Sequence, residues 1–483
     1  MAQANSLLQV YGGDEVAALV LDPGSQTTRA GFAGEDSPRV ILPSYVGVNP
    51  DQMDIDDDED DDETTPTKPV KKRQNTYYAE SSIDYPKANA NVNPIVKDGI
   101  IQDWDSAVEQ WQYIFDNLHA DYTEQPLLLT EPVWNTEENR KKSLEVSLEQ
   151  FQFPGFYLAS SPTCVAFAQG RPSALVVDIG HDVVSVTPVV DGMCLARTTL
   201  KTHYAGNYLS TQLQKKLEAT KTEVVPLYKV KSKVFTSPTE TPNWVPKTLT
   251  GPITQSFDDY QIEKTLHGIK ESLLRVPREP LTDTKLTDEE EAETHPKRSY
   301  ELPNGHAIEF GRERFEIADS IFDPKNYAIP EFGPESGEPE INSKNDYVPL
   351  KRPLKKTADE EDEKSGKKTK KDIPDYRGLS ELTSYALSLV DVDIRAQLAH
   401  NIIVTGGSSL ITGLNERLYL ELTRDHPGLK IRVHSSGSTA ERKFQSWIGG
   451  SVLSSLGTFH QLWVSKKEYE EVGVDRLLAQ RFR

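Results

Sequence analysis

Short apolar runs that end in glycine-containing turns recur along the chain. Val16 to Leu21 (VAALVL), Ala174 to Val177 (ALVV) and Asn401 to Val404 (NIIV) are each followed at once by such a turn. A short run of aliphatic, often β-branched residues bounded by turn residues is typical of a buried strand. The pattern therefore predicts three buried strands, each leading directly into a loop.

Helical stripes lie between these runs. Asn135, with Glu138 three residues on, is predicted to cap the first of them. Plain core packing accounts for every stripe, and strands that alternate with helices predict an α/β fold with largely buried sheets. Apolar residues recur at helical spacing at Leu144, Leu148 and Phe151; Leu209, Leu213 and Leu217; Ile262, Leu266, Ile269 and Leu273; and Leu414, Leu418 and Leu422.

Three polar segments interrupt this alternation of predicted strands and helices. The first, about 50–74, contains the acidic run Asp51 to Glu63 (DQMDIDDDEDDDE). The second, about 279–305, is rich in Pro, Thr and acidic residues, and the third, about 323–374, alternates acidic and lysine clusters. Runs of like charge repel one another and stay solvated. We expect each segment to be a disordered surface insertion that leaves the core untouched.

Composition narrows the class of protein. The 483 residues suffice for more than one domain, and a net charge of -21 argues against strong DNA binding by the chain alone but suits basic partners. Cys164 and Cys194 have no metal-site spacing and are predicted to be small buried residues. The first nine residues lack a signal peptide's features, and no apolar run is long enough to span a membrane. We therefore expect a soluble, intracellular protein without membrane contact.

Two of the strand ends resemble one another. One strand ends at Asp22 with Gly24 two residues on, and another ends at Asp178 with Gly180 two residues on. Each turn then enters a second β-like run, residues 29–32 in one case and 183–188 in the other. Two similar hairpins this far apart predict two related domains that face one another.

The turns carry residues suited to phosphate. Residues 22–29 and 178–182 combine glycine, hydroxyl groups and backbone N–H donors, and 405–409 (TGGSS) offers a third close approach suited to a nucleoside. Asp22 and Asp178 could hold a magnesium ion through its water shell. Any one turn alone is more simply explained as an ordinary strand-to-loop turn. Three of them, each at the end of an apolar strand, predict nucleotide binding.

Other familiar site motifs are missing from the sequence. There is no GxxxxGK[ST], HExxH, GxSxG or paired CxxC, which argues against a Walker-type ATPase and the common hydrolase and zinc classes. His181, His203 and His400 are isolated, so none is predicted to be a metal ligand.

Longer segments resemble the actin superfamily. They are AGFAGED at 30–36 with its continuation to residue 44, LLTEP at 128–132, and WIGGS at 447–451, which runs on to WVSKKEY at 463–469. The resemblance covers nearly everything outside the three insertions. It implies two α/β domains around a deep nucleotide cleft, the smaller formed by 1–168 with 445–483 and the larger by 169–444.

The resemblance also implies ATP or ADP with a divalent ion, Mg²⁺ or Ca²⁺, held by Asp22 and Asp178 through water. Lys443 would lie near the adenine. The residues that inherit nucleotide-binding roles are Asp22, Gly24, Ser25, Gln26, Thr27, Arg29, Asp178, Gly180, His181, Asp182, Gly206, Gly406, Gly407, Ser408 and Lys443.

Departures from the family pattern bear on activity. Ser161 stands where the family has a glutamine that positions the attacking water, and Ser185 stands where it has a histidine. Because orienting water is a large part of phosphate hydrolysis, turnover is expected to be absent or very slow. Gln26 and Asp182 replace glycines, and Asp182 adds negative charge near the phosphates. The acidic run 51–63 replaces an apolar-tipped self-contact loop, so copies should repel one another rather than form filaments.

Within the superfamily, residues 7–16, 133–143, 345–352 and 473–478 are similar to the actin-related protein four subfamily. That resemblance implies a nuclear, ATP-binding scaffold of chromatin-remodelling and histone acetyltransferase complexes. It would pair with actin and dock on a long helix of a large scaffold subunit. A slow ATPase, a kinase on the same fold and a cytoskeletal filament protein stay open as alternatives. So do a histone contact by 51–63 and an import or DNA-adjacent role for 355–371, beside simple solvated loops.

Overall fold

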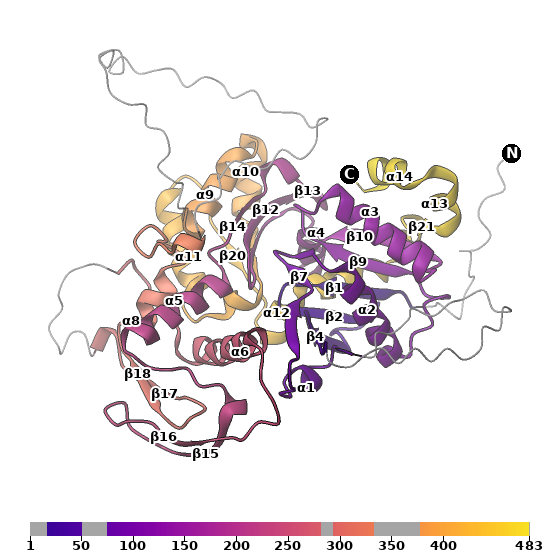
Figure 1. Ribbon diagram of the computed structural model, residues 1–483. Helices are drawn as coiled ribbons and strands as arrows, with labels where there is room; N and C mark the ends of the chain where they lie inside the picture. Colours follow the sequence, from indigo (N-terminus) through magenta and orange to yellow (C-terminus); the bar gives the residue numbers. More distant parts are fainter. Residues whose placement is uncertain (1–16, 51–74, 282–292, 333–376, 483) are drawn as a thin grey trace, which may run out of the picture.

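The computed structural model describes residues 17–50, 75–281, 293–332 and 377–482, and its elements are arranged around two sheets (Figure 1). The first sheet has the order β21-β10-β9-β1-β2-β3. Its strands are β1 (Leu19–Pro23), β2 (Thr27–Phe32), β3 (Val40–Pro43), β9 (Leu127–Glu131), β10 (Gly155–Ser160) and β21 (Val464–Ser465). The second has the order β13-β12-β11-β19-β20, with β14 also paired to β12. Its strands are β11 (Ala174–Ile179), β12 (Val184–Val190), β13 (Met193–Cys194), β14 (Leu200–Thr202), β19 (Ile402–Thr405) and β20 (Val433–His434).

The two sheets repeat one plan. In each, an antiparallel hairpin (β1–β2, β11–β12) lies beside parallel partners, β9 and β10 in the first sheet and β19 and β20 in the second. The registers match as well, since Asp22 pairs with Arg29 and Asp178 pairs with Ser185. The predicted α/β fold and the predicted relation between the two hairpins are therefore confirmed.

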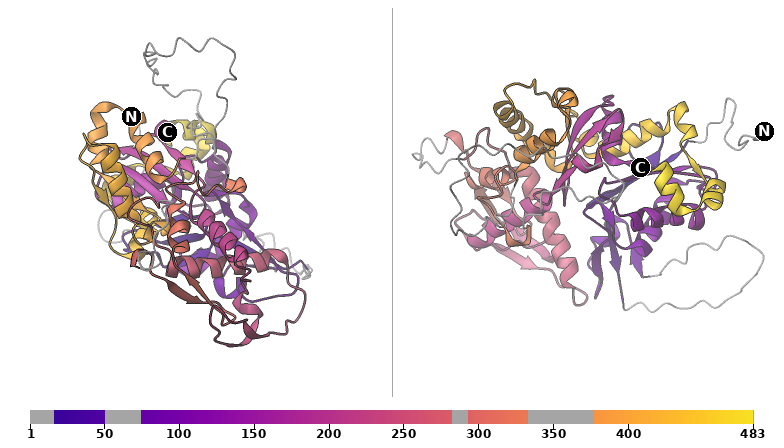
Figure 2. Two further views of the ribbon diagram at one scale, coloured as in Figure 1. Left: turned by 90° about the vertical axis from the view of Figure 1, so that its left-hand side faces the viewer. Right: turned by 90° about the horizontal axis from the view of Figure 1, so that it is seen from above.

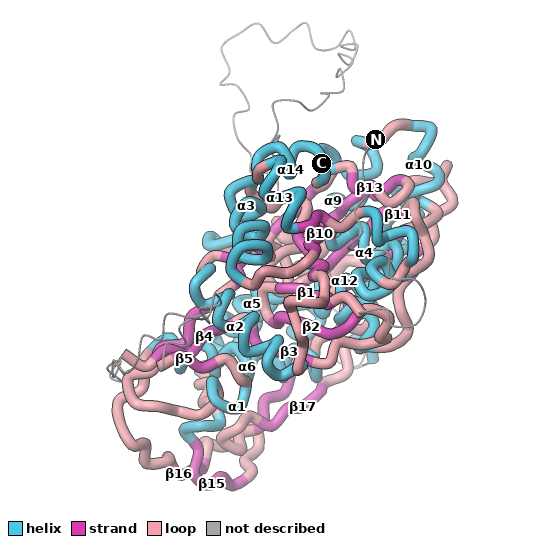
Figure 3. The backbone as a smooth tube through the Cα atoms, turned by 90° about the vertical axis from the view of Figure 1, so that its right-hand side faces the viewer, coloured by secondary structure: helices cyan, strands magenta, loops and turns pink. Residues whose placement is uncertain are grey.

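Helices pack on both sheets and small sheets extend the far ends, as the views in Figure 2 and the tube in Figure 3 show. The helices are α1 (Glu80–Ile83), α2 (Trp104–Leu118), α3 (Glu137–Glu145), α4 (Ser161–Ala168), α5 (Gly206–Ala219), α6 (Gln255–Leu273), α8 (Glu313–Asp319), α9 (Leu379–Leu389), α10 (Val392–Ala399), α11 (Leu414–Asp425), α12 (Thr439–Ser454), α13 (Lys466–Val472) and α14 (Val474–Arg481). The remaining strands are β4 (Tyr45–Val48), β5 (Thr76–Tyr77), β6 (Asn91–Pro94), β7 (Val96–Lys97), β8 (Ile100–Ile101), β15 (Val230–Val234), β16 (Asn243–Pro246), β17 (Arg298–Glu301) and β18 (Ala307–Phe310).

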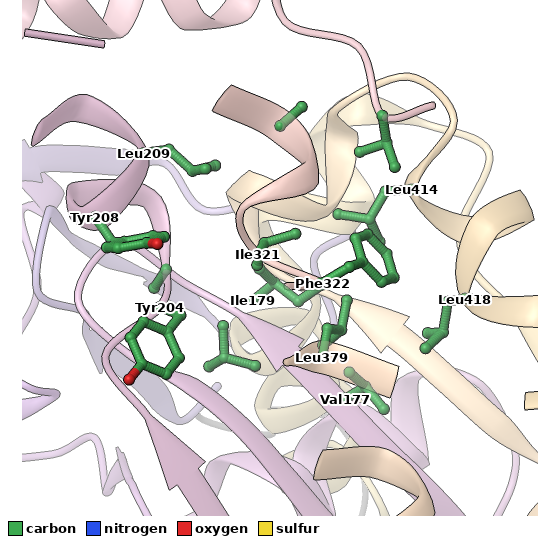
Figure 4. Packing of buried hydrophobic residues seen from close by; sticks show 14 of the residues in the cluster. Val177, Ile179, Tyr204, Tyr208, Leu209, Ile321, Phe322, Leu379, Leu414 and Leu418 are labelled. Carbon is green, nitrogen blue, oxygen red and sulfur yellow. The ribbon is translucent and has the colours of Figure 1, made fainter. Parts of the chain in front are cut away.

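The core around the second sheet contains three of the four predicted helical stripes, and the fourth, Leu144, Leu148 and Phe151, lies in the core around the first sheet. Residues of α5, α6, α9 and α11 pack with those of β11 and β12, and the close-up in Figure 4 shows Val177 and Ile179 facing Leu209, Leu379 and other buried side chains. These side chains are almost completely buried, so hydrophobic burial fixes the helices against the sheet. Around the first sheet, the aromatic rings of Phe115 and Phe151 pack edge to face.

The helix α4 joins the two halves of the molecule. Its Cys164 packs with the first sheet's residues, whereas Val165 and Ala166 pack with those of the second. α12 crosses α4 at very close range, because a Cβ added at Gly449 would overlap the carbonyl group of Cys164. This crossing is only possible with glycine at that position. α4 and α12 therefore form a tight connection at one end of the space between the sheets.

Some boundaries differ from the predictions. Leu302 and Ile329 are buried with the core of the second sheet, so the expectation that 279–305 and 323–374 leave the core untouched is wrong for residues 298–305 and 327–332. Thr136 rather than Asn135 caps α3, since its side chain accepts from the amide of Asn139. The acidic run 51–63 and the lysine clusters 355–371 lie outside the described residues, and the domain boundaries at 168/169 and 444/445 stay predictions.

Candidate functional site

A single cleft gathers the predicted site residues. It has a volume of about 840 Å³ and lies between the turns of the two sheets, with α6 along one side. Pockets of roughly 300–1,000 Å³ are usual for small-molecule and cofactor sites. The predicted residues that line it are Asp22, Gly24, Ser25, Gln26, Thr27, Arg29, Asp178, Gly180, His181, Asp182, Gly206, Gly406, Gly407, Ser408 and Lys443.

The first hairpin places a paired carboxylate in the cleft. Asp22 Oδ2 lies 2.7 Å from the Arg29 guanidinium, across the hairpin from it. Asp22 Oδ1 accepts from the hydroxyl groups of Thr130 at 2.5 Å and Ser446 at 3.2 Å. Since each bond satisfies a lone pair of a buried oxygen, Asp22 is held in one orientation. Arg29 also donates to Thr27, which ties the turn to the strand.

The second hairpin places a carboxylate with no such partner across from it. Asp178 pairs in register with Ser185, where the first hairpin has Arg29. Burial and, to a smaller extent, the negative charge of Asp22 together raise the pKa of Asp178 to about 6, although Arg29 opposes them. A carboxylate in that setting gains from a nearby cation. The donor set of two aspartates and glycine turns is therefore suited to a hydrated divalent ion.

Glycines at the third turn and at the start of α5 let main-chain segments pack closely against one another in the wall of the cleft. A Cβ on Gly406 would overlap Asp178 Oδ1 and the carbonyl group of Ile179, and this residue has a φ of 90°, where side chains are rarely accommodated. A Cβ on Gly206 would lie 2.7 Å from Ser408 Oγ. The next glycine, Gly407, differs, because a Cβ there would meet nothing within 4 Å, so open space lies beside the main chain at that residue.

His181 and Asp182 of the second turn are both engaged with protein groups. His181 Nε2 lies 2.8 Å from Glu263 Oε1, and this hydrogen bond holds the pKa of Glu263 below its usual value although burial alone would raise it. Asp182 Oδ2 accepts from the amide of Asp98, on the opposite side of the cleft. The charge of Asp182 is therefore directed toward a backbone donor. The amide of the residue after Asp98, Gly99, donates in the same way to the Ser25 hydroxyl group of the first turn.

Sequence reasoning missed Lys270 and Glu271, which line the cleft from α6 beside Lys443. Lys443 Nζ lies 3.0 Å from Glu271 Oε1. Lys270 is 7% exposed and donates to the carbonyl of Gly206 at 2.7 Å, and burial lowers its pKa to about 8. The only sequence signal for Lys270 was its position directly after Ile269, which belongs to an apolar helical stripe that we had assigned to core packing.

Ser161 and Ser185 also line the cleft. The Ser161 hydroxyl donates to the main-chain carbonyl of Glu131 at 3.0 Å. Ser185 is buried on β12, opposite Asp178. Both serine side chains are shorter than the glutamine and the histidine that the family pattern has at these two positions, so neither reaches as far into the cleft.

Comparison with known proteins decides the family. The actin family model matches residues 13–483. The chain belongs to the actin family. Curated family members named actin-related protein 4 align with it over almost their whole length, which confirms the predicted resemblance to that subfamily. The Candida albicans protein is 48% identical (99% of both chains covered), the Saccharomyces cerevisiae protein 41% (99% of this chain, 100% of that one) and the Schizosaccharomyces pombe protein 35% (97% of both).

Actin-family membership implies a nucleotide with a divalent metal in the cleft, and the residues present fit that group. The open space beside Gly407 and the buried Asp178, which has Ser185 and no cation across its hairpin, are the observations that support the fit. Within the described residues, no three His, Cys, Asp or Glu side chains cluster as direct metal ligands. That Asp22 and Asp178 hold the ion through its waters stays a prediction from the resemblance. None of the described helices is long and apolar enough to cross a membrane.

Proposed function

We propose that the chain is an ATP-binding scaffold subunit of nuclear chromatin-remodelling and histone acetyltransferase complexes. In them it pairs with actin on a long helix of a large scaffold subunit and turns over ATP very slowly or not at all. The observation that supports this is a cleft whose lining fits a metal nucleotide and contains Ser161 and Ser185, which by the resemblance replace the two residues that would orient water. The near full-length match to proteins named actin-related protein 4 supports the complex assignment.

The proposed binding mode uses groups on every wall of the cleft. Backbone N–H groups of the turns that contain Gly24 and Gly180 would hold the phosphates, and Lys270 and Glu271 lie where a ribose or base would enter. Magnesium or calcium would neutralise phosphate charge and satisfy Asp178. A ligand held at a thousandfold its Kd adds about 4 kcal/mol to folding stability. Bound ATP can therefore act as a structural element without being hydrolysed.

Nucleotide content tests the binding half of the proposal. The chain is purified in magnesium, denatured with acid, and the supernatant is separated by anion-exchange chromatography. We expect ATP in near-stoichiometric amount, and an empty protein would overturn the structural role of ATP. Phosphate release faster than about 1 per second would place it among ordinary enzymes instead.

Partner capture tests the scaffold half. The tagged full chain is recovered from nuclear extract and the co-purifying proteins are identified by mass spectrometry. Actin together with a remodelling ATPase or acetyltransferase subunits in comparable amounts is the expected result. Recovery with cytoskeletal proteins, or sedimentable filaments of the chain alone in magnesium and salt, would favour a filament protein. Histone binding by 51–63 is checked in the same extract with that segment replaced by a Gly/Ser linker of equal length.

A further inference from the structure

Two arginines are among the largest fully buried side chains of the molecule. They are Arg314 on α8 and Arg417 on α11, and each residue is 1% exposed. A guanidinium group stays charged at every physiological pH, so burying one costs free energy unless other groups replace the water that it has lost. The two arginines differ in whether they have such groups.

Arg417 has a full set of partners. Its Nη1 lies 3.1 Å from Asp319 Oδ1 and donates to the carbonyl of Pro277 at 3.0 Å, and its Nε pairs with Glu421. The ring of Phe322 lies beneath the guanidinium group, 5.1 Å from Cζ. The buried charge of Arg417 is therefore compensated within the protein.

Arg314 has no such set. Among the residues that the structure describes, no carboxylate pairs with it and no acceptor takes a hydrogen bond from its guanidinium group, and its Nε is buried without a partner. The group does lie over the ring of Phe315, with Cζ 4.6 Å from the centroid. A cation–π contact offsets only part of the cost of burying a charge. Since buried polar groups in native proteins are nearly always satisfied, Arg314 indicates a missing partner.

Two further arginines lie close enough for their charges to act on Arg314. Arg298 begins β17, where it pairs in register with Phe310, and Arg275 directly follows α6. Both are exposed, and α6 packs against β17, beside α8 in Figure 1. Burial and, to smaller extents, the positive charges of Arg298 and Arg275 lower the pKa of Arg314. Three arginines thus share one place without a carboxylate to balance them.

The carboxylates nearest in the sequence are engaged elsewhere. Glu313 Oε2 accepts from the amide of Gly311 at 2.9 Å, and Glu309 Oε2 lies 3.4 Å from Lys297 Nζ. The chain as a whole has a net charge of -21, so a cluster of arginines without acids runs against its general composition. Such a cluster is suited to an anion that comes from outside the described chain.

We propose that Arg314, Arg298 and Arg275 hold a tetrahedral oxyanion of the phosphate type, which supplies the partner that Arg314 lacks. Guanidinium groups donate two parallel hydrogen bonds to such an oxyanion, and three positive charges favour a doubly charged ion over a single carboxylate. None of these three arginines lines the nucleotide cleft, so the site is separate from it. The bound ion would join the end of α6, β17 and α8.

Thermal unfolding of the full chain and of Arg314→Met is the first test. Methionine removes the charge and keeps much of the volume, and the two proteins have the same nucleotide cleft. Each is unfolded in sodium chloride and in sodium phosphate of equal ionic strength. We expect phosphate at a hundredfold its Kd to raise the Tm of the parent by about 5 °C more than that of the variant. In chloride the variant should be at least as stable as the parent, because it no longer buries an unpaired charge.

Arg417→Met is the matched control, since Arg417 is equally buried but paired. Its Tm should fall in both buffers, because the replacement leaves Asp319 without its cation. If Arg314→Met also loses stability in both buffers, and phosphate raises the Tm of the parent and of Arg314→Met equally, Arg314 is satisfied within the protein and the proposal is overturned.

A second test uses an exposed position, where a replacement leaves the core intact. The Kd of inorganic phosphate is measured by isothermal titration calorimetry for the parent, for Arg298→Gln and for Arg424→Gln. Arg424 is a control on α11, where it is exposed and pairs with Asp425. We expect binding to weaken about tenfold in Arg298→Gln and to stay unchanged in Arg424→Gln. Equal Kd values in Arg298→Gln and the parent would exclude the site.

The chain's own acidic run 288–291 (DEEE), which lies outside the described residues, is the alternative partner. Replacing it by Ser-Gly-Ser-Gly separates the two possibilities. We expect phosphate to stabilise this variant as much as the parent. Stabilisation that appears only after the run has been replaced would show that the run itself neutralises the arginines, and the proposal would then be wrong.

Discussion

The buried ion pair between Glu131 and Arg140 makes a sharp prediction about stability. Glu131 is 7% exposed, and its carboxylate accepts from Arg140 Nε at 3.0 Å and from Asn135 Nδ2 at 2.9 Å. Arg140 Nη2 donates in turn to the carbonyl of Phe482 at 2.7 Å. Burial raises the pKa of Glu131 even with Arg140 in place. Replacing Arg140 by methionine keeps much of its volume but leaves a buried carboxylate without its cation.

The size of the effect follows from the burial. Removing one partner of a buried pair costs about 3–5 kcal/mol, and we take about 3 because the Arg140 side chain is 24% exposed. For a domain of this size that corresponds to a loss of about 6–12 °C in Tm. Without Arg140, the folded pKa of Glu131 lies still further above its unfolded value. The associated stability is present at low pH and lost as the pH rises, so the variant should lose more at pH 7.5 than at pH 5.

Thermal unfolding of Arg140→Met and of Arg140→Met/Glu131→Gln at both pH values is the assay. The double variant has no buried charge and should recover most of the loss at pH 7.5, with little dependence on pH. The part that it fails to recover measures the lost contact with Phe482. An equal Tm loss for Arg140→Met at both pH values, with no recovery in the double variant, would refute the reasoning.

Two further predictions concern the connection and the metal site. Gly449→Ala should lower stability by at least about 1–3 kcal/mol, because its Cβ meets the rigid carbonyl of Cys164. Gly457→Ala, where a Cβ meets nothing within 4 Å, should leave Tm unchanged, and equal Tm values for the two would contradict the packing argument. In nucleotide-free protein, the raised pKa of Asp178 means that its favourable contribution is lost as the pH rises from about 4 to about 6. Asp178→Asn should therefore be more stable than the parent at pH 7.5 but not at pH 4.5, and a Tm difference that does not change with pH would exclude this.

The parts that were predictable from sequence are those with local patterns. β1, β11 and β19 each carry a run of apolar residues that ends in a glycine turn, and burial on both faces leaves few other structures for such runs. The turns after Asp22, Asp178 and Thr405 were predicted to form one nucleotide site from their glycines, hydroxyl groups and carboxylates, and they line one cleft.

The remainder depends on contacts between distant segments with no periodic signature. Lys270 follows Ile269 in a helix whose apolar stripe explains the helix completely, and only the position of Gly206 reveals that the lysine faces the cleft. Residues 84–90 and 249–254 lie outside the regular helices and strands, so the contact between them, in which the amide of Asn89 donates to the carbonyl of Pro252, could not be predicted. The predicted extent of the second insertion was wrong for a similar reason, since Leu302 is a buried apolar side chain in a β-hairpin whose sequence is otherwise mostly polar.

The paired hairpins differ in a way that bears on where a metal would lie. In the first hairpin the residue paired with Asp22 is Arg29, whose guanidinium group lies 2.7 Å from the carboxylate. In the second hairpin the residue paired with Asp178 is Ser185, which carries no charge. Two equivalent carboxylates thus differ in how much each gains from an added positive charge. If the cleft holds a metal nucleotide as proposed, the ion supplies to Asp178 what Arg29 supplies to Asp22. Ser185→Lys should then keep the cleft folded without metal and weaken its dependence on magnesium, because the fixed ammonium group competes for the same carboxylate.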